Sequence, residues 1–84
     1  MENIKKQIAD IINFDSAKSF EDLNNLRDIA MKRLGEGFRK MRESGCFTSD
    51  EIDAIKDYSS TLCNSRYLSM MNYIKTNIRK NFKF

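Results

Sequence analysis

The chain has 84 residues, with 15 Lys and Arg against 12 Asp and Glu, a net charge of +3, and neither proline nor histidine. A chain of this length forms a single domain, residues 1–84, whose own hydrophobic core is small. The absence of histidine removes the commonest general base and metal ligand and leaves both cysteines without an activating partner. We therefore expect a protein that is not an enzyme, with no catalytic residue, no metal site and no cofactor.

The location expected from the sequence is the cytosol of a bacterium or of a virus-infected cell. The N-terminal residues, which include Lys5 and Lys6, lack the continuous apolar stretch of a secretory signal peptide. No apolar run approaches the length of a membrane span, so no membrane partner is expected. Cys46 and Cys63 are separated by mostly helical sequence, roughly 20–25 Å, which predicts two free thiols.

The first expected helix covers residues 2–14, and residues 15–19 form a polar connector. Its apolar stripe has steps of three and four and consists of Ile4, Ile8, Ile11 and Ile12. The second expected helix covers residues 20–44. It begins after Ser19, with Asp22 three residues later as a variant of the capping box, and it stops at Gly45, a residue suited to a left-handed C-terminal cap.

The third expected helix covers residues 49–80, about 33 residues and roughly 50 Å. Thr48 and Glu51 form a capping box at its start, and Phe47 and Ile52 form a hydrophobic staple. The short turn after Gly45 makes the second and third helices antiparallel neighbours. Counted outward from the turn, this pairing sets Met41 opposite Ile52, Phe38 opposite Ile55, Leu34 opposite Ser59, Leu26 opposite Tyr67 and Phe20 opposite Ile74.

These elements predict an all-α fold: an antiparallel helical hairpin with a shorter N-terminal helix, assembled into an oligomeric bundle. The third helix should outrun the second, and the first helix is expected to cover its far end. A small domain has little capacity to bury both long stripes together with Phe82 and Phe84, so we expect a homo-oligomer. Ile74 and Ile78 are the residues expected to support self-association.

Residues 27–42 contain six basic side chains around an apolar stripe and two glycines, Gly35 and Gly37. Each glycine costs about 0.8–1 kcal/mol relative to alanine inside a helix, so both need a reason. One reason is close helix–helix approach opposite Ser59 and Cys63. The other is access of a phosphate-bearing ligand or a second subunit to the backbone, beside cationic donors. The candidate ligand-binding residues are Arg27, Lys32, Arg33, Gly37, Arg39, Lys40, Arg66 and Tyr67.

Charge along the third helix is uneven: Asp50, Glu51, Asp53 and Asp57 lie near its start, and no acid follows Asp57. Complementarity to the helix macrodipole is one explanation. A basic surface for an anionic partner is the other.

The segment from Ile29 to Met41, IAMKRLGEGFRKM, resembles a helix of the phage cyclic-oligonucleotide sponges that counter CBASS immunity. Ile29, Leu34, Gly37, Phe38 and Met41 match its isoleucine–leucine–glycine–phenylalanine pattern. Arg33 corresponds to a basic position of that family. The resemblance implies a small, all-helical, oligomeric, phage-encoded anti-defence protein that sequesters signalling nucleotides between subunits and has no enzymatic activity.

The main hypothesis for function is a non-enzymatic helical binding protein that sequesters an anionic ligand, a cyclic nucleotide or nucleic acid, through its basic helix surfaces. The alternative is a protein–protein inhibitor or adaptor that docks an apolar helix face on a host protein. A helix-turn-helix DNA reader fits less well, because the turn after Gly45 joins helices too long and too antiparallel for that motif.

Overall fold

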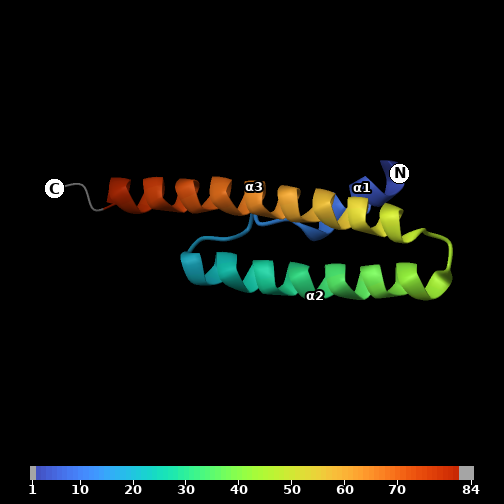
Figure 1. Ribbon diagram of the computed structural model, residues 1–84. Helices are drawn as coiled ribbons and strands as arrows, with labels where there is room; N and C mark the ends of the chain where they lie inside the picture. The colour runs from blue at the N-terminus through green and yellow to red at the C-terminus, as the bar shows by residue number, and fades with distance from the viewer. Residues whose placement is uncertain (1, 82–84) are drawn as a thin grey trace.

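The computed structural model describes residues 2–81, and within them the chain forms three helices and no strand. The helices are α1 (Glu2–Ile11), α2 (Phe20–Ser44) and α3 (Ser49–Asn81). Figure 1 shows α2 and α3 as an antiparallel hairpin, with α1 beside α3 and the end of α3 extending past the start of α2. The expected all-α hairpin with a shorter N-terminal helix is confirmed. The expected contribution of Phe82 and Phe84 lies outside the described residues.

Local hydrogen bonds set both ends of α2. The hydroxyl oxygen of Ser19 accepts a hydrogen bond from the backbone N–H of Asp22 at 3.1 Å, which satisfies one of the free donors of the first turn. At the other end Gly45 has φ +68°, the left-handed conformation that glycine adopts without steric cost. Both helix ends therefore follow from residues next to them in sequence.

The start of α3 is a complete capping box. The N–H of Glu51 donates to Thr48 Oγ1 at 3.1 Å, and the N–H of Thr48 donates to Glu51 Oε1 at 3.0 Å. Phe47 is half-buried and Ile52 is buried, as expected for the two residues of the staple. From this start α3 runs without interruption for 33 residues.

Helix α1 ends earlier than expected, at Ile11 instead of Phe14. Ile12 closes the last turn through its N–H to the carbonyl of Ile8, and Asn13 then accepts the N–H of Asp15 on its side-chain oxygen. This local bond competes with helix continuation. Phe14 consequently leaves the helix and turns inward, where its side chain is only 1% exposed. It gains more from full burial than from one further helical turn.

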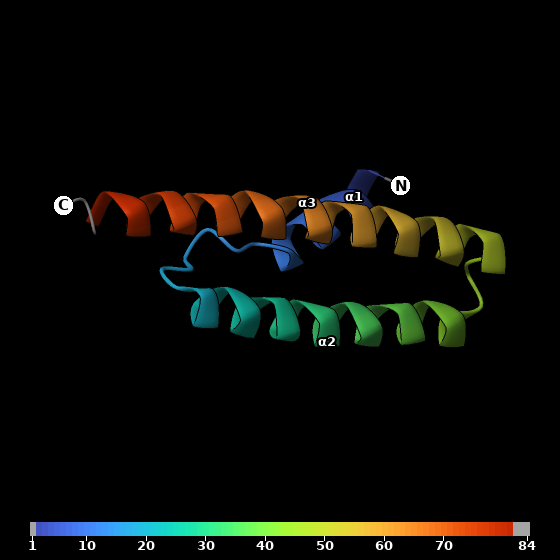
Figure 2. The same ribbon diagram turned by 60° about the vertical axis from the view of Figure 1, so that its left-hand side comes forward.

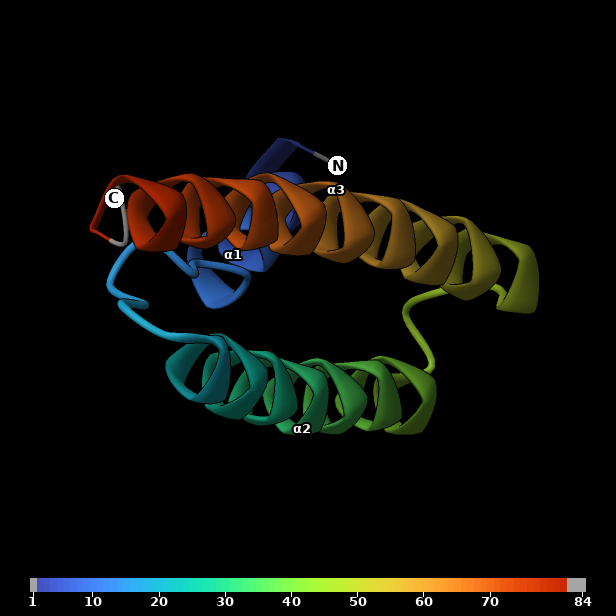
Figure 3. The same cartoon turned by 90° about the vertical axis from the view of Figure 1, so that its left-hand side faces the viewer.

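The expectation that the first helix covers the far end of α3 is wrong, because α1 lies along the first half. Ile4 and Ile8 pack beside Ile55 and Tyr58, and the end of α1 reaches Arg66. The linker, residues 12–19, then crosses to the start of α2 (Figure 2). In Figure 3, α1 lies behind α3. The end of α1 lies at the middle of α3, and the linker continues from there to Phe20, at the end of the hairpin opposite the turn. The linker therefore takes up the far side, and α1 lies on the side of the turn.

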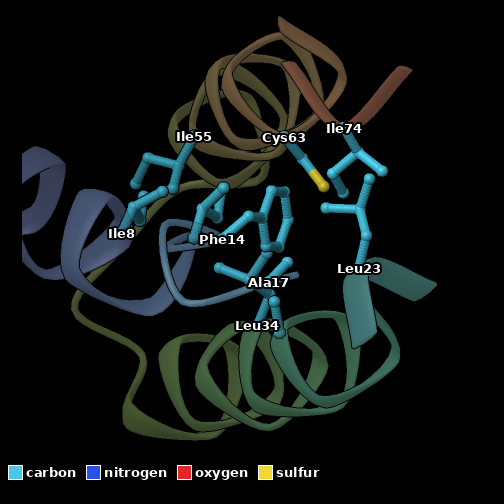
Figure 4. Packing of buried hydrophobic residues seen from close by; sticks show 10 residues of the cluster. Ile8, Phe14, Ala17, Leu23, Leu34, Ile55, Cys63 and Ile74 are labelled. Carbon is cyan, nitrogen blue, oxygen red and sulfur yellow. The ribbon is translucent and has the colours of Figure 1, made fainter. Parts of the chain in front are cut away.

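The core lies where α1, the linker and the hairpin meet. Figure 4 shows Ile8 beside Ile55 at one side, Phe14 in the middle, and Leu23 and Ile74 pointing toward each other at the other side. Ile74 is therefore covered within one chain, whereas Ile78 is 41% exposed. Of these two residues, only Ile78 is free to contact another copy.

Candidate functional site

A groove follows the hairpin on the side that α1 does not cover. It has a volume of about 170 Å³, and none of its lining residues comes from α1 or the linker. We call it the hairpin groove, and it is lined by Met31, Leu34, Gly35, Phe38, Ser59, Ser60 and Cys63. The expected pairing of Leu34 with Ser59 places both at this groove. Met31 is 57% exposed, so the groove presents apolar surface to solvent.

Gly35 forms an open position in the wall of the hairpin groove. A Cβ atom built on Gly35 meets no atom within 4 Å, and the same holds for Gly37. Close approach of α3 to the backbone of α2 is therefore not the reason for either glycine, and that expectation is wrong. The helix carries the conformational cost of both glycines without a compensating contact within the chain.

One helical turn beyond Met31 and Cys63, at one end of the hairpin groove, an arginine is stacked on a tyrosine. The guanidinium carbon of Arg27 lies 4.6 Å from the centre of the Tyr67 ring, and the Tyr67 hydroxyl donates to Asn24 Oδ1 at 2.8 Å. This is close to the expected pairing of Tyr67 with Leu26. The hydrogen bond holds the ring in place, and the ring orients the guanidinium while its N–H donors stay accessible.

The other end of the hairpin groove also carries a cation over a ring. Lys56 Nζ lies 5.9 Å from the centre of the Phe38 ring. Lys56 and Tyr67 are separated by three turns of α3, roughly 16 Å. The groove is thus an apolar channel with a positive charge at each end.

Cys63 is the last residue of α3 that lines the hairpin groove, and it is buried. Burial raises the pKa of its thiol above the usual 9.0, and the positive charge of Arg27 offsets part of this rise. The thiol is therefore protonated at neutral pH and is a poor nucleophile.

The other candidate residues lie on different surfaces. Arg33 and Gly37 line a small crevice of about 60 Å³ between α2 and α1. Arg39 is exposed and lies 3.9 Å from the carboxylate of Glu43, a surface pair worth little to stability. Lys32 and Lys40 are exposed on α2. The structure therefore brings Arg27 and Tyr67 together and does not gather the eight candidate residues at one place.

Arg66 has a structural role that the sequence pattern did not reveal. Its Nη1 atom donates to the carbonyl oxygens of Ala9 at 2.7 Å and Ile12 at 2.5 Å, so it caps the C-terminal end of α1. It also lines a cleft of about 400 Å³ between the linker and α3. Asp10 and Asp15 line the same cleft, so its charge is mixed and does not favour an anion.

Sequence reasoning missed Met31, Lys56 and Ser60 as residues of this surface. A signal was present, because Lys56, Ser60, Cys63 and Tyr67 follow one another at steps of four, three and four along α3. Within residues 2–81 no cluster of three or more Cys, Asp or Glu side chains is arranged to hold a metal ion. No helix in that range is both long enough and apolar enough to cross a membrane.

No family model, no curated protein and no solved structure matches this chain. The likeness of residues 29–41 to the cyclic-oligonucleotide sponges stays a hypothesis.

Proposed function

We propose that this protein is a non-enzymatic binding protein that takes an anionic ligand with a flat, apolar part, such as a nucleotide or a short stretch of single-stranded nucleic acid, into the hairpin groove. The observation that supports this proposal most directly is the pair of Arg27 and Tyr67 at the end of the groove, 4.6 Å apart. The guanidinium, held with one face on the ring, offers planar donors to a phosphate and its other flat face to a base.

The middle of the hairpin groove supports the same proposal. Gly35 leaves room beside the backbone that no neighbouring atom of the described residues occupies, and Ser60 supplies an exposed hydroxyl on the facing helix. Met31 and Phe38 form an apolar floor on which a base or sugar can rest. The glycine then has a function in binding that offsets its cost in the helix.

The experiment is a fluorescence anisotropy titration with labelled single-stranded DNA and RNA, together with calorimetry of mono-, di- and cyclic oligonucleotides. The cyclic molecules test the sponge resemblance. Arg27→Gln should lower affinity about 10-fold or more, because it removes charge-assisted hydrogen bonds of roughly 1.5–3 kcal/mol. Arg33→Gln removes the same charge at the crevice beside α1 and is the matched control.

A second variant separates binding from folding. Gly35→Leu fills the hairpin groove without changing the charge and replaces a helix-breaking residue with a helix-forming one. It should abolish binding while leaving the helix content unchanged by circular dichroism. Millimolar or weaker affinity for every compound tested, or equal losses from Arg27→Gln and Arg33→Gln, would contradict the proposal.

The exposed apolar side chains support a second candidate, an inhibitor or adaptor that binds a host protein through the hairpin groove. Met31 and Phe20 are exposed on α2, at 57% and 39%. An acidic amphipathic helix would fit an apolar channel with cations at both ends. A stable complex with a host protein that is lost in Gly35→Leu, together with no nucleotide binding, would favour this candidate.

A further inference from the structure

The outward side of α3 carries two like-charged pairs of opposite sign. Asp53 and Asp57 are four residues apart, as are Lys75 and Arg79, so each pair lies on one side of the helix. Like charges at this spacing destabilise an isolated helix. In residues 2–81 the single ion pair is Arg39 with Glu43, so none of these four charges forms an ion pair within that range.

The helix macrodipole accounts for only one of these four charges. Its effect falls off within the first and last turns of a helix, and Arg79 is the one that lies in such a turn, the last turn of α3. Asp53 and Asp57 lie beyond the first turn, which begins at Ser49, and Lys75 lies before the last turn, which ends at Asn81. These three charges point to a partner outside the described residues.

The two pairs are symmetric about the middle of α3. Asp57 and Lys75 are equally far in sequence from residue 66, and so are Asp53 and Arg79. A two-fold axis that crosses α3 at this level would bring each acid of one copy beside a base of the other. The exposed positions between the two pairs are all uncharged, and they include Thr61, Asn64 and Leu68.

We infer that two copies of this chain associate through the outward side of α3 in an antiparallel, two-fold symmetric pair. Asp57 lies opposite Lys75 of the second copy, and Asp53 lies opposite Arg79 of the second copy. Leu68, which is 56% exposed, meets Leu68 of the second copy about 6 Å away along the helix axis. A parallel arrangement would instead set acids against acids and bases against bases.

The size of this surface sets the strength of the association. One helix side about 50 Å long offers less than the roughly 800 Å² per partner of a standard interface. The area is small and each exposed ion pair contributes little, so the association should be weak, with a dissociation constant of about 10–500 µM that rises with salt. The surface contains none of the residues of the hairpin groove. The dimer and the proposed function can therefore be tested independently.

The test is sedimentation velocity of the full chain without any ligand, across a dilution series at low and high salt. Asp57→Lys should weaken the dimer about 10-fold or more, because the two-fold axis repeats each repulsive contact. Lys75→Asp should do the same. The double variant with both changes should restore the wild-type dissociation constant, and an equimolar mixture of the two single variants should form a heterodimer. Asp28→Lys, which makes the same charge change on exposed α2, should have no effect.

Circular dichroism of each variant is the control, and it should show the helix content of the wild type. A wild-type chain that is monomeric at about 500 µM in low salt would overturn the inference, since that lies at the weak end of the range expected from the interface size. A dimer that Asp57→Lys leaves unchanged, or one that the double variant fails to restore, would also overturn it. Loss of the dimer in Leu68→Ser supports the proposed centre of the interface, whereas an unchanged dissociation constant contradicts it.

Discussion

The guanidinium of Arg66, in the middle of α3, donates a hydrogen bond of 2.5 Å to the carbonyl oxygen of Ile12, at the end of α1. The same nitrogen also reaches the carbonyl of Ala9 at 2.7 Å. Carbonyl groups at the end of a helix have no partner within it, so a side chain from another element has to satisfy them. This contact joins the end of α1 to α3, and the buried Phe14 follows two residues later.

Arg66→Met should therefore destabilise the protein although it retains an apolar side chain of similar length. We expect a loss of roughly 1.5–3 kcal/mol in the free energy of unfolding, the usual range for hydrogen bonds to a charged group. Urea unfolding followed by circular dichroism measures it. Lys80→Met, at an exposed position of the last turn, should leave the midpoint unchanged, and equal midpoints for both variants would refute the structural role of Arg66.

Gly35→Ala and Gly45→Ala should change stability in opposite directions. At Gly35 a Cβ meets no atom within 4 Å, so alanine should stabilise the helix by about 0.8–1 kcal/mol. At Gly45, φ +68° is unfavourable for an L residue, and alanine should cost about 1–2 kcal/mol. Thermal unfolding of the two variants gives the signs directly. A destabilised Gly35→Ala would show that the position is already filled.

The capping box at Thr48 should contribute stability that depends on pH. The backbone and side-chain hydrogen bonds with Thr48 hold the pKa of Glu51 below its usual 4.5. A lowered carboxyl pKa stabilises the folded state above the unfolded pKa, and this contribution is lost as pH falls through the lowered value. The advantage of the wild type over Glu51→Gln, measured by urea unfolding, should thus shrink between about pH 7 and pH 3. No change in this difference would contradict the lowered pKa.

Removing the other member of the capping box tests it at neutral pH. Thr48→Ala leaves the N–H of Glu51 without its side-chain acceptor, which should cost about 0.5–2 kcal/mol. Thr48→Ser retains the hydroxyl and is the matched control. Equal urea midpoints for the alanine and serine variants would show that the hydroxyl contributes nothing.

The two cysteines should react at very different rates with a thiol reagent. Cys46 is exposed in the hairpin turn, whereas Cys63 is buried and its pKa is raised. At neutral pH one equivalent of a reagent such as iodoacetamide should label Cys46, and Cys63 should react only after unfolding in urea. Mass spectrometry of the digested protein identifies the labelled site. Equal labelling in the folded protein would show that the groove opens readily.

The sequence by itself determined the helix ends whose hydrogen bonds are local. Ser19 with Asp22, the left-handed Gly45, and Thr48 with Glu51 all act between residues no more than three positions apart or within a single turn. Apolar periodicity then determined the antiparallel pairing of α2 and α3, because two stripes joined by a short turn have one way to meet. For these features a pattern of neighbouring residues is sufficient.

Only the tertiary structure decided the end of α1, the role of Arg66 and the openness of Gly35. Arg66 and Ile12 are 54 positions apart, and no local pattern marks an arginine as a cap for a distant helix. The sequence predicted both Arg27 and Tyr67 as ligand-binding residues, but their stacking depends on the rotation of two helices about their axes. Close packing was one of two expected reasons for the glycines, and only the tertiary structure showed that a Cβ at Gly35 or Gly37 meets no neighbouring atom within 4 Å.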